Sequence, residues 1–308
     1  RWPNRYITMG HAVLSEYRAG NASLKLTPVD FTAAPDGATR ISTRATLSGP
    51  LGNGRVDGLT VPINGYWNGG SRIIVNRDCV AAGFDRLAIS GLVLDPTRLR
   101  LCPEGSALLQ VTRGGVRGGA RIGAPHLTGH IGGTPLDLSA TDTHFRLTDN
   151  GFALSDVKAR LGSADSLTRI DATRITGTVS GGTVAGTFTG GAGQIGNVPL
   201  KMSDAAGDWR LANGVLDLKG GLTVADTAES PRFRPLASDD FQLRLAGSDI
   251  TAGGTLKMPD TGVKITDVSL AHDLSSGTGH ADLAVPGITF TPDGLQPDQI
   301  TPLTLGVV

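Results

Sequence analysis

Residues 241–245 read Phe-Gln-Leu-Arg-Leu, so apolar side chains alternate with polar ones at a period of two. Successive side chains of a β-strand point to opposite faces of a sheet, and this period therefore puts the three apolar side chains on one face. The same alternation recurs at residues 136–138 and 216–219, and glycine, asparagine and proline separate such segments along most of the chain. The sequence therefore predicts a β protein with almost no helix.

The composition excludes several classes of function. Glycine occupies 44 of the 308 positions without a strict third-residue period, so the chain is not collagen-like. Lysine plus arginine and aspartate plus glutamate are equal at 28 each, so no net charge draws the protein to nucleic acid or to an anionic membrane surface. Aromatic residues make up only 5% of the chain, too few for a platform on which bases or sugars stack.

The only helix that the sequence predicts covers residues 11–18, a segment of mixed polarity with a glycine stop at Gly20. Near the C-terminal end the parity of the apolar positions changes twice, between Ile265 and Val268 and between Val285 and Ile288. A slip of one residue would turn the apolar set to the other face of the sheet. Each change therefore predicts a bulge or bend that curves the sheet.

We expect the chain to be a segment of a longer protein. It begins at Arg1, shows no charged-then-apolar leader, and ends in an apolar stretch, residues 301–308, that predicts further sheet. It contains no run of the ~18 apolar residues that a membrane-spanning helix needs. We interpret residues 1–308 as a single elongated β segment.

Cys79 and Cys102 are the only two cysteines, and neither belongs to a CxxC motif. A disulfide between them would close a loop of about 24 residues and remove roughly 3 kcal/mol of unfolded-chain entropy. We predict this disulfide, which favours an oxidising compartment, with two buried free thiols as the alternative.

No constellation of residues predicts an active site. His126 and His130 have the spacing of two zinc ligands on a helix, but Pro125 and the nearby glycines argue against a helix. His272 beside Asp273 predicts a hydrogen-bonded turn, because no nucleophile is placed near them. We therefore assign no catalytic residue, no metal site and no cofactor.

The strongest feature is an apolar sheet face without helices to cover it. Two arrangements keep such a face out of water. The sheet closes on itself, as in a β-helix or a sandwich, or it leaves a groove that solvates acyl chains.

The C-terminal third carries a resemblance to a known family. Its residues are Pro231-Arg232-Phe233-Arg234-Pro235-Leu236 and the segments 250–256, 268–279, 284–288 and 295–303. These segments, together with Cys79 and Leu101-Cys102-Pro103, resemble the YdbH family of envelope proteins. That family belongs to the AsmA-like, TamB-like group and is sometimes catalogued under a "dicarboxylate transport" domain name.

The resemblance implies an elongated, twisted, mostly antiparallel sheet curled into a taco-like, U-shaped open groove with a hydrophobic concave face. It also implies phospholipid transfer between the inner and outer membranes, a periplasmic location, and an inner-membrane helix that this chain lacks. A small outer-membrane lipoprotein would add strands to an open edge of the sheet. The family has no catalytic residues. We expect the acyl chains to contact Phe241, Leu243, Leu245, Leu256, Ile265, Leu270, Leu283 and Val285.

Two other functions stay open at this point. A closed right-handed β-helix, as in an adhesin-like passenger, a structural protein or a polysaccharide-acting enzyme, would show a regular rung length and in-line ladders of side chains. A dicarboxylate-binding protein would need polar donors between two α/β lobes. Neither pattern is visible in the sequence, and the curvature that separates an open groove from a closed tube does not follow from it.

Overall fold

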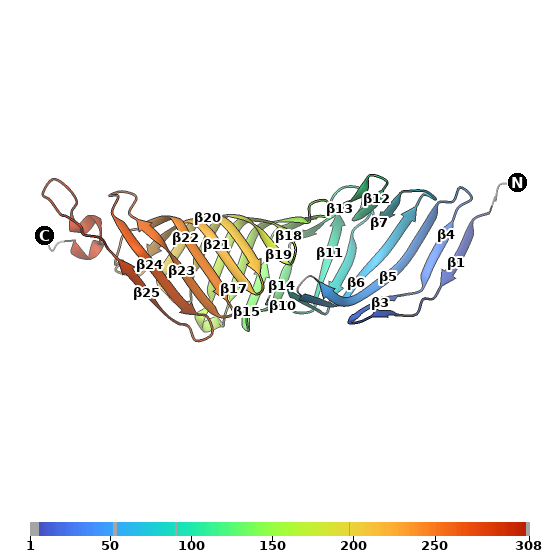
Figure 1. Cartoon of the computed structure of the whole chain (residues 1–308), viewed down its shortest axis with the longest axis horizontal. Helices are drawn as coiled ribbons and strands as arrows, with labels where there is room; N and C mark the ends of the chain where they lie inside the picture. Colours follow the sequence, from blue (N-terminus) through green and yellow to red (C-terminus); the bar gives the residue numbers. More distant parts are fainter. Residues whose placement is uncertain (1–5, 52–53, 90, 197, 306–308) are drawn as a thin grey trace. The chain divides into compact units, whose positions relative to one another are not determined.

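The computed structural model of the chain describes residues 6–51, 54–89, 91–196 and 198–305. Within these residues the protein is all-β, with 25 strands and three short 3-10 helices (Figure 1). The predicted fold class, a large antiparallel sheet, is confirmed, and the arrangement is consistent with a groove-like sheet. The ladders of the described residues are antiparallel, which rules out the parallel coils of a right-handed β-helix, and no α-helix in this part of the chain supplies an α/β lobe.

The chain divides into two compact units. Unit 1 comprises the chain up to Leu127 together with Ala140–Leu154 and Thr178–Gly182, and unit 2 comprises Thr128–Ser139, Ser155–Gly177 and the chain from Thr183 onward. The interpretation of residues 1–308 as one β segment stays a prediction.

The strands of unit 1 are β1 (Thr8–Ala12), β2 (Tyr17–Ala19), β3 (Ala22–Leu26), β4 (Val29–Ala33), β5 (Thr39–Leu51), β6 (Gly54–Trp67), β7 (Ile73–Val75), β8 (Val80–Phe84), β9 (Arg86–Ile89), β10 (Leu92–Leu94), β11 (Thr97–Pro103), β12 (Leu109–Thr112), β13 (Gly115–Gly123) and β16 (Asp142–Arg146). Residues of both units form β14 (His126–Ile131), β17 (Gly151–Leu161) and β18 (Thr168–Ser180). The elements of unit 2 are β15 (Thr134–Ser139), η1 (Ala164–Ser166), β19 (Thr183–Gln194), β20 (Leu200–Ala212), β21 (Val215–Asp226), β22 (Leu236–Ala246), β23 (Asp249–Lys257), β24 (Lys264–Asp273), β25 (Thr278–Ala284), η2 (Pro297–Gln299) and η3 (Pro302–Thr304).

The predicted helix over residues 11–18 is wrong. His11 belongs to β1, where it lies opposite Asp30 of β4, and Tyr17 begins β2, opposite Leu24 of β3. Helix propensity is a weak preference, and partner strands that satisfy the backbone hydrogen bonds override it. Both ends of the predicted helix therefore lie in strands, Thr8–Ala12 and Tyr17–Ala19.

Two expectations near the C-terminus also fail. Strand β25 ends at Ala284, so the parity change between Val285 and Ile288 does not lie in a strand, which agrees with Pro286 lacking a backbone donor. Within residues 301–305, Pro302 begins the 3-10 turn η3 and Thr301 caps it, where the sequence predicts more sheet. Residues 306–308 lie outside the described residues.

Strands β4 to β7 of unit 1 carry an apolar row on one face. Phe31, Ile41, Gly65 and Val75 lie opposite one another on neighbouring strands and form an apolar row. The register one residue further puts Asp30, Ser42 and Asn64 on the other face. That other face also holds Tyr66 and Ile74, which lie opposite each other, and Ile74 is only 2% exposed. The two-faced alternation therefore holds for these two rows and not for every row of the unit.

Cys79 and Cys102 form a disulfide. Leu101 of β11 pairs with Val80 of β8, so the next residues in this register, Cys102 and Cys79, lie opposite each other. The bridge therefore fastens one end of the β8–β11 ladder.

Strands β19 to β25 of unit 2 lie side by side in chain order, and Figure 1 shows them from yellow to red. Their ladders are interrupted by register shifts in mid-strand, for example between Ser203 and Ala206 and between Thr266 and Ser269. Asp204 and Asp267 have positive φ at these two places. The bulge predicted between Ile265 and Val268 is therefore confirmed, and such bulges bend the strands.

Gly207 and Gly220 allow the closest backbone approach in this bend. They lie opposite each other on β20 and β21. A Cβ atom on Gly207 would lie 1.9 Å from the carbonyl oxygen of Lys219, and one on Gly220 would lie 2.0 Å from that of Ala206. No side chain fits at either position, so part of the glycine excess serves the curvature of the sheet.

Candidate functional site

Unit 2 contains an apolar hollow of about 580 Å³ on one face of strands β20 to β25. That volume lies within the roughly 300–1,000 Å³ of small-molecule sites in proteins. Aliphatic side chains and glycines make up most of its wall. The apolar members outside glycine and alanine are Ile195, Val198, Leu200, Met202, Leu222, Val224, Phe233, Leu236, Phe241, Leu243, Ile250, Leu256, Ile265, Val268, Leu270 and Leu283.

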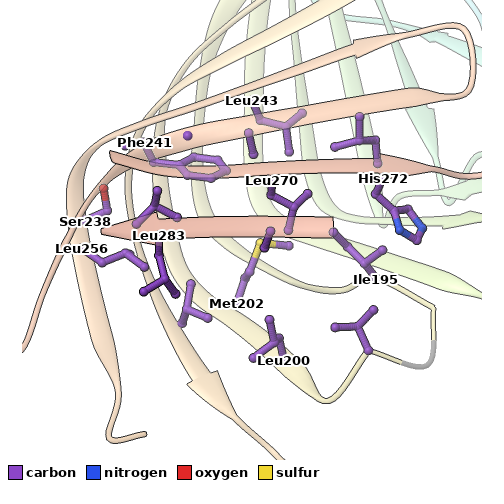
Figure 2. Close-up of a pocket in the computed structure, with 18 of the residues that line it drawn as sticks. Ile195, Leu200, Met202, Ser238, Phe241, Leu243, Leu256, Leu270, His272 and Leu283 are labelled. Atoms are coloured by element: carbon purple, nitrogen blue, oxygen red, sulfur yellow. The ribbon is translucent and has the colours of Figure 1, made fainter. Parts of the chain in front are cut away.

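The antiparallel register arranges these side chains in rows that cross the strands. Leu243 of β22 lies opposite Ala252 of β23, which lies opposite Leu270 of β24 and, beyond it, Ala281 of β25. A second row begins at Met202 and continues to Val224 and Leu236. Figure 2 shows Phe241, Leu243, Leu270 and Leu283 around the hollow, with Met202 and Leu200 on its other side. An apolar chain that follows a row therefore meets only hydrocarbon.

The hollow is bounded by both ends of the strands. We call the short turns after β18, β20, β22 and β24 the hairpin rim, and the connections after β17, β19, β21 and β23 the loop rim. His272 and Gly277 lie at the hairpin rim, whereas Ile195 and Phe233 lie at the loop rim, and all four line the same hollow. The sheet of unit 2 therefore curves until its two rims border one concave space.

Six of the eight residues expected from the sequence to contact acyl chains line this hollow: Phe241, Leu243, Leu256, Ile265, Leu270 and Leu283. Leu245 does not. Its side chain is 6% exposed, so it belongs to the core beside the hairpin rim. Val285 lies just past the end of β25 and is 46% exposed, outside the hollow.

Several lining residues were missed by the sequence reasoning. Leu200 and Met202 flank Lys201 in the same alternation as the residues that were chosen, so a stricter use of the pattern finds them. Ile195 and Phe233 lie in connections without alternation, and only the curvature of the sheet brings them to the hollow.

Polar side chains are few in the wall of the hollow. They are Ser238, His272 and His280. The hydroxyl of Ser238 donates to Oδ1 of Asp240 (3.1 Å), so its hydrogen bond is made within the protein. His272 lies opposite Gly279, where a Cβ atom would come within 2.8 Å of the ring Nδ1. The missing side chain at Gly279 therefore leaves room for the imidazole at the hairpin rim.

Asp273 organises the turn that follows His272. Its Oδ1 accepts hydrogen bonds from the hydroxyl and the backbone N–H of Ser275 (2.5 and 2.7 Å) and from the backbone N–H of Ser276 (3.1 Å). The hydroxyl of Ser275 is the main reason that the pKa of Asp273 lies below its usual value. The predicted hydrogen-bonded turn is confirmed, and the carboxylate is used to hold it.

Asp226 holds the loop that carries Phe233. Its Oδ2 accepts from Nε of Arg232 (2.5 Å) and from the backbone N–H of Arg232 (2.9 Å), and its Oδ1 accepts from the N–H of Ala228 (2.9 Å). The side chain has no solvent-exposed surface. The Arg232 guanidinium first, and then the backbone donors, keep the pKa of Asp226 far below its usual value.

The C-terminal segment is fastened to the same loop. Nε of Arg234 donates to the carbonyl of Asp298 (3.0 Å), and the hydroxyl of Thr301 donates to the carbonyl of Arg232 (2.5 Å). Residues of η2 and η3 are therefore tied to the loop rim beside the hollow.

The opposite face of the same strands is polar. Nη1 of Arg244 donates to Oδ1 of Asp217 (2.9 Å), and Asp208 lies opposite Lys219. Opposite charges on this face thus lie across from each other on neighbouring strands, whereas the hollow is apolar. The two faces of one sheet thus have opposite chemistry, as the sequence pattern predicts.

The described residues show neither a cluster of metal ligands nor a helix that could span a membrane. Within 6–51, 54–89, 91–196 and 198–305, no group of three or more histidine, cysteine, aspartate or glutamate side chains is placed to hold a metal ion. His126 and His130 lie on strand β14, so their spacing is not that of a helical zinc site. The same part of the chain has no helix with the length and apolarity required to traverse a bilayer.

The chain matches the model of a known protein family. A family model described as "YdbH-like: Intermembrane phospholipid transport protein YdbH" matches residues 13–308. No curated protein and no solved structure matches the chain.

Proposed function

Because this chain belongs to the YdbH-like family of intermembrane phospholipid transport proteins, we propose that unit 2 carries phospholipid acyl chains along its apolar rows. The observation that supports this most is the row Leu243–Ala252–Leu270–Ala281, which crosses four strands without a polar side chain. The contact residues are Phe241, Leu243, Leu256, Ile265, Leu270 and Leu283.

The driving force is the removal of methylene groups from water. Each buried methylene contributes about 0.8 kcal/mol, so ten of them stabilise the bound chain by about 8 kcal/mol. This contact has no preferred direction, because it does not depend on hydrogen-bond geometry. An acyl chain therefore leaves water readily and still slides from one row position to the next.

We place this groove in the periplasm as part of a bridge between the inner and outer membranes. The family supplies the intermembrane setting. The Cys79–Cys102 disulfide supports an oxidising compartment. Anchoring in the inner membrane belongs to the same proposal.

Strand β25 is the proposed attachment point for a small outer-membrane lipoprotein. One edge of β25 pairs with β24, and all seven of its residues, Thr278–Ala284, are exposed. An exposed strand edge offers free backbone donors and acceptors to an added strand. The partner's strand would extend the rows of the hollow by one more position.

Lipid retention tests the proposed conduit. The purified protein, incubated with phosphatidylethanolamine vesicles and reisolated, is expected to carry phospholipid that mass spectrometry detects. Leu270→Glu should abolish retention because it puts a carboxylate into the apolar row. Its matched control is Ser269→Glu, which changes the neighbouring exposed residue on the other face. A wild-type protein that retains no lipid, or equal loss in both variants, would refute the proposal.

A further inference from the structure

Two turns that belong to different rims of unit 2 touch each other. Gly132 lies in the turn between β14 and β15, and Gly247 lies in the turn between β22 and β23. A Cβ atom placed on Gly132 would lie 2.6 Å from the carbonyl carbon and oxygen of Gly247 and 2.7 Å from its Cα. The backbones of the two turns are therefore in direct contact, with no side chain between them.

The two turns approach from opposite rims. Gly247 is part of the hairpin rim. Leu136 of β15 pairs with Leu161 of β17, and the N–H of Gly162 donates to the carbonyl of Pro135 (3.0 Å), so the Gly132 turn lies at the loop-rim end of β17. A contact between Gly132 and Gly247 therefore joins one rim to the other.

Strand tilt explains how residues so distant in the sheet can meet. From β15 through β17, β18, β19, β20 and β21 to β22 is six strand steps, or roughly 29 Å at ~4.8 Å per step. Strands β19 and β21 have 12 residues each. A strand of that length spans ~40 Å, and a tilt of roughly 45° displaces its two ends by ~28 Å along the sheet axis. A displacement of that size matches the separation of the two strands.

The exposed fractions of the side chains agree with a concave face that is closed near the Gly247 turn. Leu245 and Ile250, which pair beside the Gly247 turn, are 6% and 5% exposed. Three strands along from β22, Leu283 of β25 also lines the hollow but is 61% exposed. The concave face is thus covered near Gly247 and open toward β25.

We propose that the turn Ile131–Thr134 and the turn Ala246–Asp249 form a clasp across the mouth of the groove, and that Gly132 and Gly247 decide which lipids pass. This rests on the proposed lipid conduit. Acyl chains slide beneath the clasp. A phospholipid headgroup, which stays at the mouth in water, passes only when the clasp opens.

The clasp is built to open. Among the described residues, no hydrogen bond joins one of these turns to the other. Their contact consists of dispersion alone, which is weak for so few atoms. Gly132 and Gly247 have φ of +56° and +65°, so both turns use a backbone conformation that glycine adopts without strain.

Locking the clasp is the first arm of the test. Gly133 is exposed with no atom within 4 Å of its added Cβ, and Ser248 neighbours Gly247, so Gly133→Cys and Ser248→Cys provide two thiols. The native cysteines are paired and do not compete. A short bis-maleimide bridges the new thiols, and the control carries a single-headed maleimide on each of them.

The protein is tethered by its N-terminus to acceptor vesicles and by its C-terminus to donor vesicles of phosphatidylethanolamine. The bridged protein is expected to transfer acyl-labelled phosphatidylethanolamine about tenfold more slowly than the control, and labelled palmitic acid at nearly the control rate. Equal phosphatidylethanolamine rates in both proteins would overturn the clasp and leave the conduit intact. If neither lipid moves in the control, the conduit fails, and the second arm decides on the clasp.

The second arm tests the contact itself through the yield of cross-link. Gly132→Ala pushes a methyl group into the Gly247 backbone and should lower that yield severalfold. Its matched control, Gly247→Ala, changes the other glycine of the same contact at a similar φ, but its Cβ meets no atom within 4 Å. The cross-link yield of Gly247→Ala should equal that of the parent protein, which carries only Gly133→Cys and Ser248→Cys. Equal loss in both variants would refute the contact.

Discussion

Arg244 and Asp217 pair at 2.9 Å between Nη1 and Oδ1 on the face of β22 and β21 that points away from the hollow. The residues next to them, Leu243 and Leu218, lie opposite each other on the apolar face. One step along either strand therefore moves a side chain from solvent into the apolar row. This alternation makes it possible to change the proposed conduit and the outer surface separately.

Leu243 and Leu245 should respond differently to the same charge. Leu243 is half-buried and lines the hollow, so Leu243→Asp is expected to lower phospholipid retention about tenfold while the free energy of unfolding falls by less than about 1 kcal/mol. Leu245 is 6% exposed, so Leu245→Asp should unfold unit 2 by burying an unpaired carboxylate. Urea denaturation and lipid mass spectrometry separate the two effects. Parallel losses in both variants would make Leu243 a core residue.

The close approach at Gly220 predicts a cost for the smallest added side chain. Gly220→Ala puts a methyl group 2.0 Å from the carbonyl oxygen of Ala206, so the strands must separate, at a cost of about 1–3 kcal/mol in the free energy of unfolding. Gly287→Ala is the control, because its Cβ meets no atom within 4 Å, and its effect should stay within about 0.5 kcal/mol. Urea denaturation measures the free energy of unfolding of both variants. Similar values for the two variants would mean that the bend does not depend on Gly220.

The strands and their two faces could be predicted from the sequence for a physical reason. Side chains at period two face one side whatever the partner strand is, so the alternation of Phe241, Leu243 and Leu270 with polar neighbours was enough to place them on the apolar face. The change of parity between Ile265 and Val268 likewise predicted a bulge. Without an extra residue in the strand, the apolar side chains after the change would point to the other face of the sheet.

Contacts between distant strands could not be predicted in the same way. The contribution of Ile195 and Phe233 to the hollow depends on the curvature of the sheet, and Gly132 meets Gly247 across strands that are far apart in the sheet. Neither quantity is encoded in a local pattern. The wrong helix prediction at His11 has another origin. It relied on a weak local preference for helix and did not include the backbone pairing with strand β4.

Removal of the disulfide should weaken unit 1. Cys79→Ser together with Cys102→Ser removes the bridge that joins the ends of β8 and β11. The expected loss is about 3 kcal/mol in the free energy of unfolding, because the disulfide closes a loop of about 24 residues in the unfolded chain. Hydrogen exchange should show faster exchange in β8 and β11 and unchanged exchange in β22 to β24. Unchanged protection of β8 would contradict this prediction.

Acid should erase the contribution of Asp226 to stability. Arg232 and two backbone N–H groups keep its pKa in the folded protein far below the unfolded value of about 3.9, so the folded state favours the carboxylate. Its stabilisation is therefore complete above that unfolded value and is lost progressively as the pH falls below it toward the folded pKa. Asp226→Asn should have a lower melting temperature than the parent at pH 7, and the difference should shrink between pH 4 and pH 2. Asp217→Asn, at a partly exposed pair, serves as the control with a small difference throughout. A difference for Asp226→Asn that stays constant from pH 7 to pH 2 would show that the loop carrying Phe233 does not depend on the charge of Asp226.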